Sequence, residues 1–115
     1  MFCVSIRMMV GPDKRMELAQ AITSLVGSIR AEKGCQCCNF YQSVEDENEL
    51  YFLGGWDSRE GLVRHLRSED FKVLLGAMHL LRKPHEMSLY EMVDCLEKGD
   101  EGATPQECNV KQATG

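Results

Sequence analysis

The spacing of apolar side chains switches between a strand-like and a helix-like period along residues 2–94, and this order constrains the fold more than any other feature. Alternation with period two indicates a half-buried strand, whereas apolar residues three and four apart indicate a helix. The sequence predicts strands over 2–9, 35–44, 49–56 and 86–94, a helix over 14–33, and two helical stretches that follow Ser58 and Ser68 and end at Pro84.

The third predicted strand carries apolar side chains on both of its faces. One face has Leu50, Phe52 and Trp56, and the other has Tyr51 and Leu53. A sheet with one face open to water would not need this, so each face is covered. The order β-α-β-β-α-β predicts an α+β ferredoxin-like domain, a four-stranded antiparallel sheet with the helices on one face. The simplest cover for the other face is a second copy, so we predict a homodimer.

Four residues mark the expected helix ends. Asp13 follows a Gly-Pro turn and is expected to cap the first helix, and Gly34 is expected to end it. Ser58 and Ser68 are expected to cap the two later helical stretches.

Length and charge narrow the class of protein. The 115 residues suit one domain, which we place at residues 1–95, and the polar, glycine-rich residues 96–115 are interpreted as a flexible tail. With 13 basic and 18 acidic residues the net charge is −5, and no basic cluster offsets it, so nucleic acid and anionic membranes are poor candidate partners. The chain begins with no signal-peptide pattern and has no membrane-spanning apolar run, so we expect a cytoplasmic protein.

The cysteines look more like a site than any other residue type. Because no secretion signal is seen, we expect free thiols. On a strand, Cys35 and Cys37 would point one way and Cys38 the other, and no second ligand pair follows, so we predict no metal. Thiols filling sheet positions are the default, and a redox-sensing pair is the alternative. The six cysteines are Cys3, Cys35, Cys37, Cys38, Cys95 and Cys108.

Several short motifs are spread over residues 1–94. They are Gly11-Pro12-Asp13-Lys14, Arg30-Ala31-Glu32-Lys33-Gly34-Cys35, Phe40-Tyr41-Gln42, Trp56-Asp57-Ser58-Arg59-Glu60 and His65-Leu66-Arg67-Ser68-Glu69-Asp70-Phe71-Lys72. Together they resemble the antibiotic-biosynthesis monooxygenase domain family, also called quinol monooxygenases, within the dimeric α+β barrel group. The resemblance is fairly specific for the fold and less so for the reaction, because similar proteins include oxygenases, isomerases and members without known activity.

The resemblance implies a pocket between sheet and helices in each protomer. Oxygenases of this family use no metal or flavin; they help deprotonate a phenol, quinol or anthrone, and the carbanion reacts directly with oxygen. Trp56 matches the family's pocket tryptophan and His65 a common histidine. Three positions depart from the polyketide-oxidising members: Phe52 replaces an asparagine, Leu62 a tyrosine, and Gly54 a frequent acidic residue.

Seven residues are candidates for the site. Trp56 is expected to orient an aromatic substrate, although a lone tryptophan is more often simply core. His65, expected at the pocket rim, and His79 are candidate bases, although solvated or capping histidines are more common. The candidate substrate contacts are Asn39 and Tyr41, expected to share a strand face with Cys35 and Cys37, together with Phe71 and Tyr90.

The functional prediction is a cofactor-independent monooxygenase acting on a quinol-like or polycyclic aromatic molecule. The alternatives are a non-catalytic module that binds a small hydrophobic ligand or serves a stress response, and an isomerase or lyase using the same pocket. An apolar cavity with a histidine within hydrogen-bond reach of its centre would favour an enzyme. A filled interior would favour a structural or interaction role.

Overall fold

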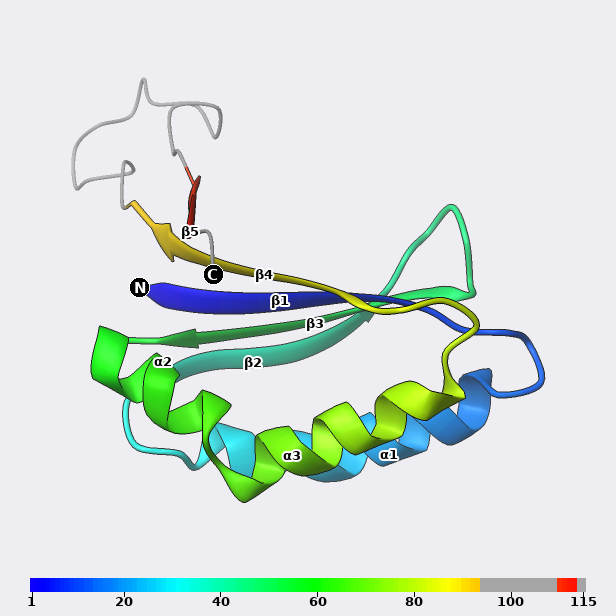
Figure 1. Cartoon of the computed structure of the whole chain (residues 1–115), viewed down its shortest axis with the longest axis horizontal. Helices are drawn as coiled ribbons and strands as arrows, with labels where there is room; N and C mark the ends of the chain where they lie inside the picture. Colours follow the sequence, from blue (N-terminus) through cyan, green and yellow to red (C-terminus); the bar gives the residue numbers. More distant parts are fainter. Residues whose placement is uncertain (94–109, 114–115) are drawn as a thin grey trace.

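A computed structural model of the chain describes residues 1–93 and 110–113. Each predicted strand and helix is present. Their bounds are β1 (Phe2–Met9), α1 (Arg15–Arg30), β2 (Cys35–Gln42), β3 (Glu49–Trp56), α2 (Arg59–Leu66), α3 (Glu69–Gly76), the 3-10 helix η1 (Ala77–Leu80), β4 (Glu86–Met92) and β5 (Val110–Ala113) (Figure 1).

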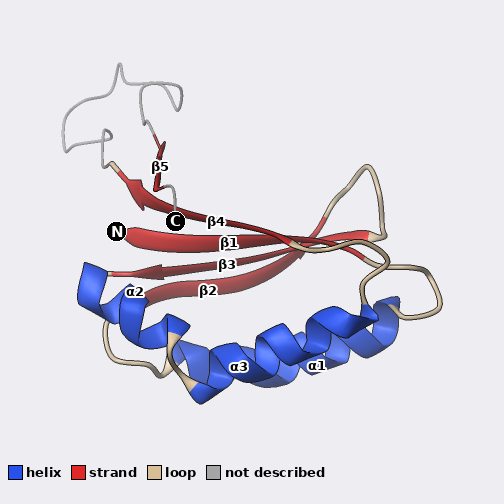
Figure 2. Ribbon diagram, viewed as in Figure 1, coloured by secondary structure: helices blue, strands red, loops and turns tan. Residues whose placement is uncertain are grey.

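The strands form one antiparallel sheet in the order β2-β3-β1-β4-β5. All helices lie on one face of this sheet, as Figure 2 shows. The ferredoxin-like prediction is therefore confirmed. Part of the predicted tail, Val110–Ala113, pairs with β4 as a fifth strand, whereas 94–109 and 114–115 lie outside the described residues. No helix in the described part of the chain is long and apolar enough to cross a membrane.

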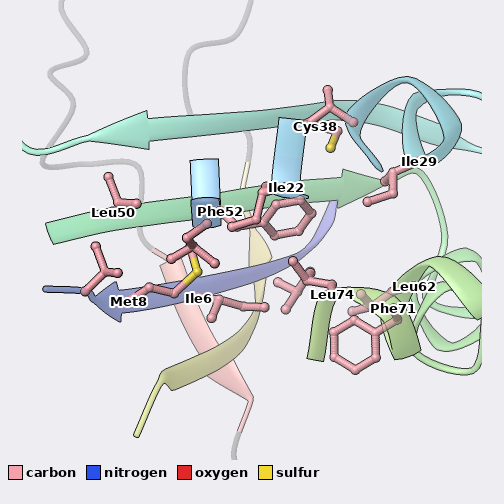
Figure 3. Close-up of a cluster of buried hydrophobic side chains, with 14 of the residues drawn as sticks. Ile6, Met8, Ile22, Ile29, Cys38, Leu50, Phe52, Leu62, Phe71 and Leu74 are labelled. Carbon is pink, nitrogen blue, oxygen red and sulfur yellow. The ribbon is translucent and has the colours of Figure 1, made fainter. Parts of the chain in front are cut away.

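The core lies between the sheet and the helices (Figure 3). Alternate residues of β1 and β3 point into it, because successive side chains of a strand face opposite ways. From β1, Ile6 and Met8 are fully buried there, and from β3, Phe52 and Trp56. The helices contribute one stripe each; on α1 it is Leu18, Ile22, Val26 and Ile29.

The opposite face of the sheet, which we call the open face, carries no helix. Its composition is mixed along the strands. At one end Arg7 forms ion pairs with Glu49 and Glu86. Toward the middle, Leu53 of β3 lies opposite Ser5 of β1, and aromatic residues flank them. The expectation of an apolar open face therefore holds only for part of it.

Two expected helix ends were wrong. Helix α1 is preceded by Lys14, whose side chain makes no capping hydrogen bond, so Asp13 is not the cap. The helix ends at Arg30, with Ala31 as its C-cap, and Gly34 instead lies in the turn that leads into β2, with φ of +82°. A Cβ there would lie 2.6 Å from Oδ1 of Asp57, so both backbone and space require glycine. The Ser58 and Ser68 caps are confirmed: they accept from the backbone N–H groups of Gly61 and Phe71 at 3.0 and 3.1 Å.

A β-bulge at the start of β2 corrects the predicted positions of the cysteines. Cys35 lies opposite Trp56, whereas Cys37 lies opposite Gly55, so the register shifts at Gln36. The extra residue turns Cys35 toward the helices and leaves Cys37 on the open face. Cys35 therefore does not share a face with Cys37, Asn39 and Tyr41, as the unbroken alternation predicted.

Candidate active site

His65 is the only polar or charged side chain that is buried among residues 1–93, with 0% of its surface exposed. Helix α2 begins at the Ser58 cap, and its period brings Leu62 and His65 to the inner face together. The predicted position at a pocket rim was therefore wrong. The histidine lies under the sheet, where an unpaired charge would be costly.

Aromatic rings enclose the imidazole of His65. The indole of Trp56, at the end of β3, stacks on it with ring centroids 4.3 Å apart and planes inclined by 26°. The Phe71 ring from α3 meets it edge-on at 5.3 Å, and the Phe52 ring lies 6.5 Å away. Burial among these rings lowers the pKa of His65 to about 4. The imidazole is therefore neutral at physiological pH.

The carboxyl group of Glu32, just beyond the end of α1, contacts this imidazole. Its two oxygens lie 3.0 and 3.1 Å from Nδ1 of His65. Burial and the neighbouring carboxylate of Asp70 raise the pKa of Glu32 to about 7. Glu32 therefore changes its charge at neutral pH.

Asp70, near the start of α3, extends the cluster toward solvent. The hydroxyl of Ser28 on α1 donates to it and lies 2.9 and 3.1 Å from its two oxygens. Asp70 is half-buried and Ser28 is exposed. Polar side chains thus gather between the surface and the buried imidazole: Ser28 and Asp70 form one hydrogen-bonded pair, and Glu32 and His65 form the other.

Two buried nitrogen atoms of the cluster have no hydrogen-bond partner within the described residues: Nε1 of Trp56 and Nε2 of His65. Most buried polar atoms in proteins are paired, so an unpaired one calls for an explanation. The tautomer follows from the partner at Nδ1. When Glu32 is ionised, the Nδ1–H of His65 donates to it, and Nε2 then presents a free lone pair.

The space around these nitrogen atoms is filled. Trp56, His65 and Phe52 have no exposed surface. A Cβ added to Gly54 or Gly61 would lie 2.8 or 3.3 Å from atoms of Trp56, so the glycines are in contact with the indole side chain. A small molecule can reach Nε2 only if α2 or α3 moves away from the sheet.

The other predicted site residues lie elsewhere. His79 is exposed on η1 and donates from Nδ1 to the carbonyl of Gly76 at 2.6 Å. The open face holds Asn39, which accepts from Arg30 at 3.3 Å, and a hollow of about 330 Å³. The structure thus brings together Trp56, His65 and Phe71, and separates them from Asn39, Tyr41 and Tyr90. The hollow is lined by Ser5, Tyr41, Tyr51, Phe52, Leu53 and Tyr90.

Sequence reasoning missed Glu32, Asp70 and Ser28. One signal was present: Ser28 and Glu32 are four residues apart at the end of the first helix, so they share a side of it. The sequence does not predict which residue packs against that side of the helix. His65 does so through a contact with Glu32, which lies 33 positions away in the chain.

The described cysteines form no comparable site. Cys3, Cys35, Cys37 and Cys38 are free thiols, and Cys95 and Cys108 lie outside the described residues. Burial raises the pKa of Cys38 to about 12, so its thiol stays protonated. Within residues 1–93, no group of three or more His, Cys, Asp or Glu side chains could hold a metal ion.

Solved structures similar to this one share its fold. A conserved protein from Methanosarcina mazei Go1 is 28% identical with a TM-score of 0.73, covering 78% of this chain and 90% of that one. Rv0793 from Mycobacterium tuberculosis is 26% identical with a TM-score of 0.74, covering 84% and 98%. A structure described as antibiotic biosynthesis monooxygenase is 21% identical with a TM-score of 0.72, covering 81% and 99%.

No protein with a curated description matches this chain. The family model described as antibiotic biosynthesis monooxygenase matches residues 1–75, which is well over half of the 115 residues. The match includes β1 to β3 and both residues of the stacked pair, Trp56 and His65. The chain therefore belongs to the antibiotic biosynthesis monooxygenase family.

Proposed function

We propose that this protein is a cofactor-independent monooxygenase that acts on a quinol-like or polycyclic aromatic small molecule. The observation that carries the proposal is the unpartnered Nε2 of His65, buried against the indole of Trp56. A neutral imidazole with a free lone pair is suited to accept a proton from a phenolic hydroxyl.

The chemistry follows from the substrate class. A substrate hydroxyl would donate its proton to Nε2 of His65, while the rings of Trp56 and Phe71 flank the aromatic system. The resulting anion is electron-rich and reacts with molecular oxygen. One oxygen atom enters the ring system and the other leaves as water with two substrate hydrogens, so a quinol or anthrone supplies all the electrons required.

Access to this site requires a movement of the protein. Because Nε2 of His65 is buried, α2 or α3 must move away from β3 before a flat molecule can enter. The two helices meet at Arg67 and Ser68, a short junction in which Ser68 also donates to the carbonyl of His65 at 2.6 Å. Such gating excludes water from the reactive anion.

The test is oxygen uptake by the purified protein with a panel of reduced quinols and anthrones. His65→Gln keeps a polar side chain but removes the base, and uptake should fall roughly 10²–10⁴-fold. His85→Gln in the loop before β4 is the matched control, and His79→Gln tests the other candidate base. Uptake no faster than the autoxidation blank for every compound would overturn the proposal.

One observation favours a second function, a non-catalytic ligand-binding module. The interior around Trp56 is filled, whereas the open face has the tyrosine-lined hollow of about 330 Å³. Aromatic compounds that bind without oxygen uptake would support this function. Binding that is lost in Tyr51→Ala but kept in Trp56→Phe would place the ligand on the open face.

We further propose that the protein is a homodimer formed through the open face, and that it works in the cytoplasm. Leu53, Tyr51 and Tyr41 give that face an apolar centre, and Tyr41 is 49% exposed in the single chain. A reducing compartment suits the four described free thiols.

A further inference from the structure

The carboxyl group of Glu32 is the only hydrogen-bond partner that the described residues provide for the imidazole of His65. It contacts Nδ1, the ring nitrogen on the other side from the unpartnered Nε2. A proton accepted at one nitrogen of an imidazole can be matched by release of a proton from the other. Through the imidazole, the buried lone pair on Nε2 is therefore connected with the side chain of Glu32, which is 18% exposed.

We propose that during turnover Glu32 takes up the Nδ1 proton of His65 while Nε2 takes up the proton of the substrate, so that the negative charge moves from the Glu32 carboxylate to the substrate without a charged imidazole. This inference rests on the proposed function. Glu32 acts through His65 and is therefore a positioning residue, and His65 is the group that touches the substrate.

The step balances without another reactant. The substrate O–H bond breaks and an Nε2–H bond forms on His65. At the same time the Nδ1–H bond breaks and an O–H bond forms on Glu32. The imidazole is neutral before and after, with its tautomer exchanged. When water leaves the oxygenated product, the same movement in reverse returns the proton from Nε2 and resets Glu32.

The pKa values favour this exchange. The low pKa of His65, caused by burial, disfavours the imidazolium. The high pKa of Glu32, caused by burial and by Asp70, allows the carboxyl group to keep a proton near pH 7. The charged and titratable groups facing Glu32 are His65 from α2, Asp70 from α3 and the thiols of Cys35 and Cys38 from β2; the indole of Trp56 from β3 also faces it.

The first test needs no substrate. In ¹⁵N NMR spectra, Nε2 of His65 should lack a proton above neutral pH, when Glu32 is ionised and accepts from Nδ1–H. Below neutral pH the proton on Glu32 donates to Nδ1, and Nε2 should carry the hydrogen, with no imidazolium in between. A fixed tautomer across neutral pH, or an imidazolium, would overturn the inference.

Two variants sharpen this test. Glu32→Gln cannot take up the proton, so the tautomer should stay the same across neutral pH. Asp70→Asn removes the carboxylate that raises the pKa of Glu32, so the tautomer exchange should move to lower pH. Glu45→Gln, in the loop after β2, is the matched control and should leave the exchange unchanged. If the midpoint pH of the tautomer exchange were the same in Asp70→Asn as in the wild type, the carboxylate of Asp70 would not be what raises the pKa of Glu32.

Activity then separates this inference from the proposed function. If the protein is an oxygenase, Glu32→Gln should lower kcat roughly 10²–10⁴-fold, and the wild-type rate should rise with pH through a midpoint near the pKa of Glu32, about 7. Tautomer exchange without any oxygen uptake would overturn the proposed function and leave the Glu32–His65 coupling standing. Oxygen uptake that is unchanged in Glu32→Gln would overturn the coupling alone.

Discussion

The indole ring of Trp56 folds back over Gly54, two residues before it on the same face of β3. A Cβ at Gly54 would lie 2.8 Å from both Cη2 and Cζ3 of the indole. The ring thus occupies the space that a side chain at residue 54 would fill. It also reaches His65, so one glycine makes room for the stacked pair at the centre of the candidate site.

Gly54→Ala should therefore destabilise the fold by about 1–3 kcal/mol, because the indole must shift and the core is overpacked. The fluorescence of Trp56, the sole tryptophan, reports the change directly during denaturant unfolding. The matched control is Gly27→Ala on the exposed side of α1, where a Cβ meets nothing within 4 Å. There we expect a gain of about 0.4–1 kcal/mol. A change in the free energy of unfolding that has the same sign in Gly54→Ala and Gly27→Ala would contradict the role of Gly54.

Ser68→Ala should cost about 1 kcal/mol or more of unfolding free energy, because its hydroxyl caps α3 and also donates to the carbonyl of His65. Asp13→Ala should change the stability by less than about 0.5 kcal/mol, since Asp13 caps no helix. Urea midpoints of the two variants check both values. Equal losses would mean that the caps have been assigned to the wrong residues.

The pH dependence of stability should differ sharply between the wild type and Glu32→Gln. The pKa of His65 falls from 6.5 to about 4 on folding. Its contribution to the free energy of unfolding is therefore present above pH 6.5 and lost as the pH falls through 4. The pKa of Glu32 rises from 4.5 to about 7, so its contribution is present below pH 4.5 and lost as the pH rises through 7. Between pH 4.5 and 6.5 the unfolding free energy should therefore change little with pH, because the contribution of His65 rises with pH while that of Glu32 falls.

Glu32→Gln removes one of these two contributions. The unfolding free energy of the variant should rise with pH between 4 and 6.5, by at most about 1.4 kcal/mol per pH unit. Urea unfolding across this range, compared with Glu45→Gln, measures the slope. A variant whose profile runs parallel to the wild type would show that the two groups do not titrate in opposite senses.

Leu53→Glu should convert the proposed dimer into a monomer, because it places a charge in the centre of the open face opposite Ser5. Val44→Glu in the β2–β3 loop is the control, since Val44 is fully exposed and outside the sheet. Light scattering coupled to size-exclusion chromatography gives the mass of each. A monomeric wild type would remove the dimer proposal before either variant is needed.

The order of elements and the two faces of the sheet were predictable, because they depend on local periodicity. Phe52 and Trp56 point to the core as their spacing predicts. The contact between Glu32 and His65 could not be predicted from the sequence, because it depends on how the end of α1 meets α2 after folding. The bulge at Gln36 was equally hidden, since no glycine or proline marks it in the sequence.

That bulge allows the labelling rate of one thiol to serve as an internal reference for the labelling rate of another. Cys35 and Cys37 are separated by one residue yet lie on opposite faces of the sheet, so a thiol-modifying reagent approaches them from different directions. A partner on the open face would shield Cys37 and leave Cys35 unaffected. The ratio of their labelling rates, read by mass spectrometry at rising protein concentration, would therefore report occupancy of that face independently of the total reagent.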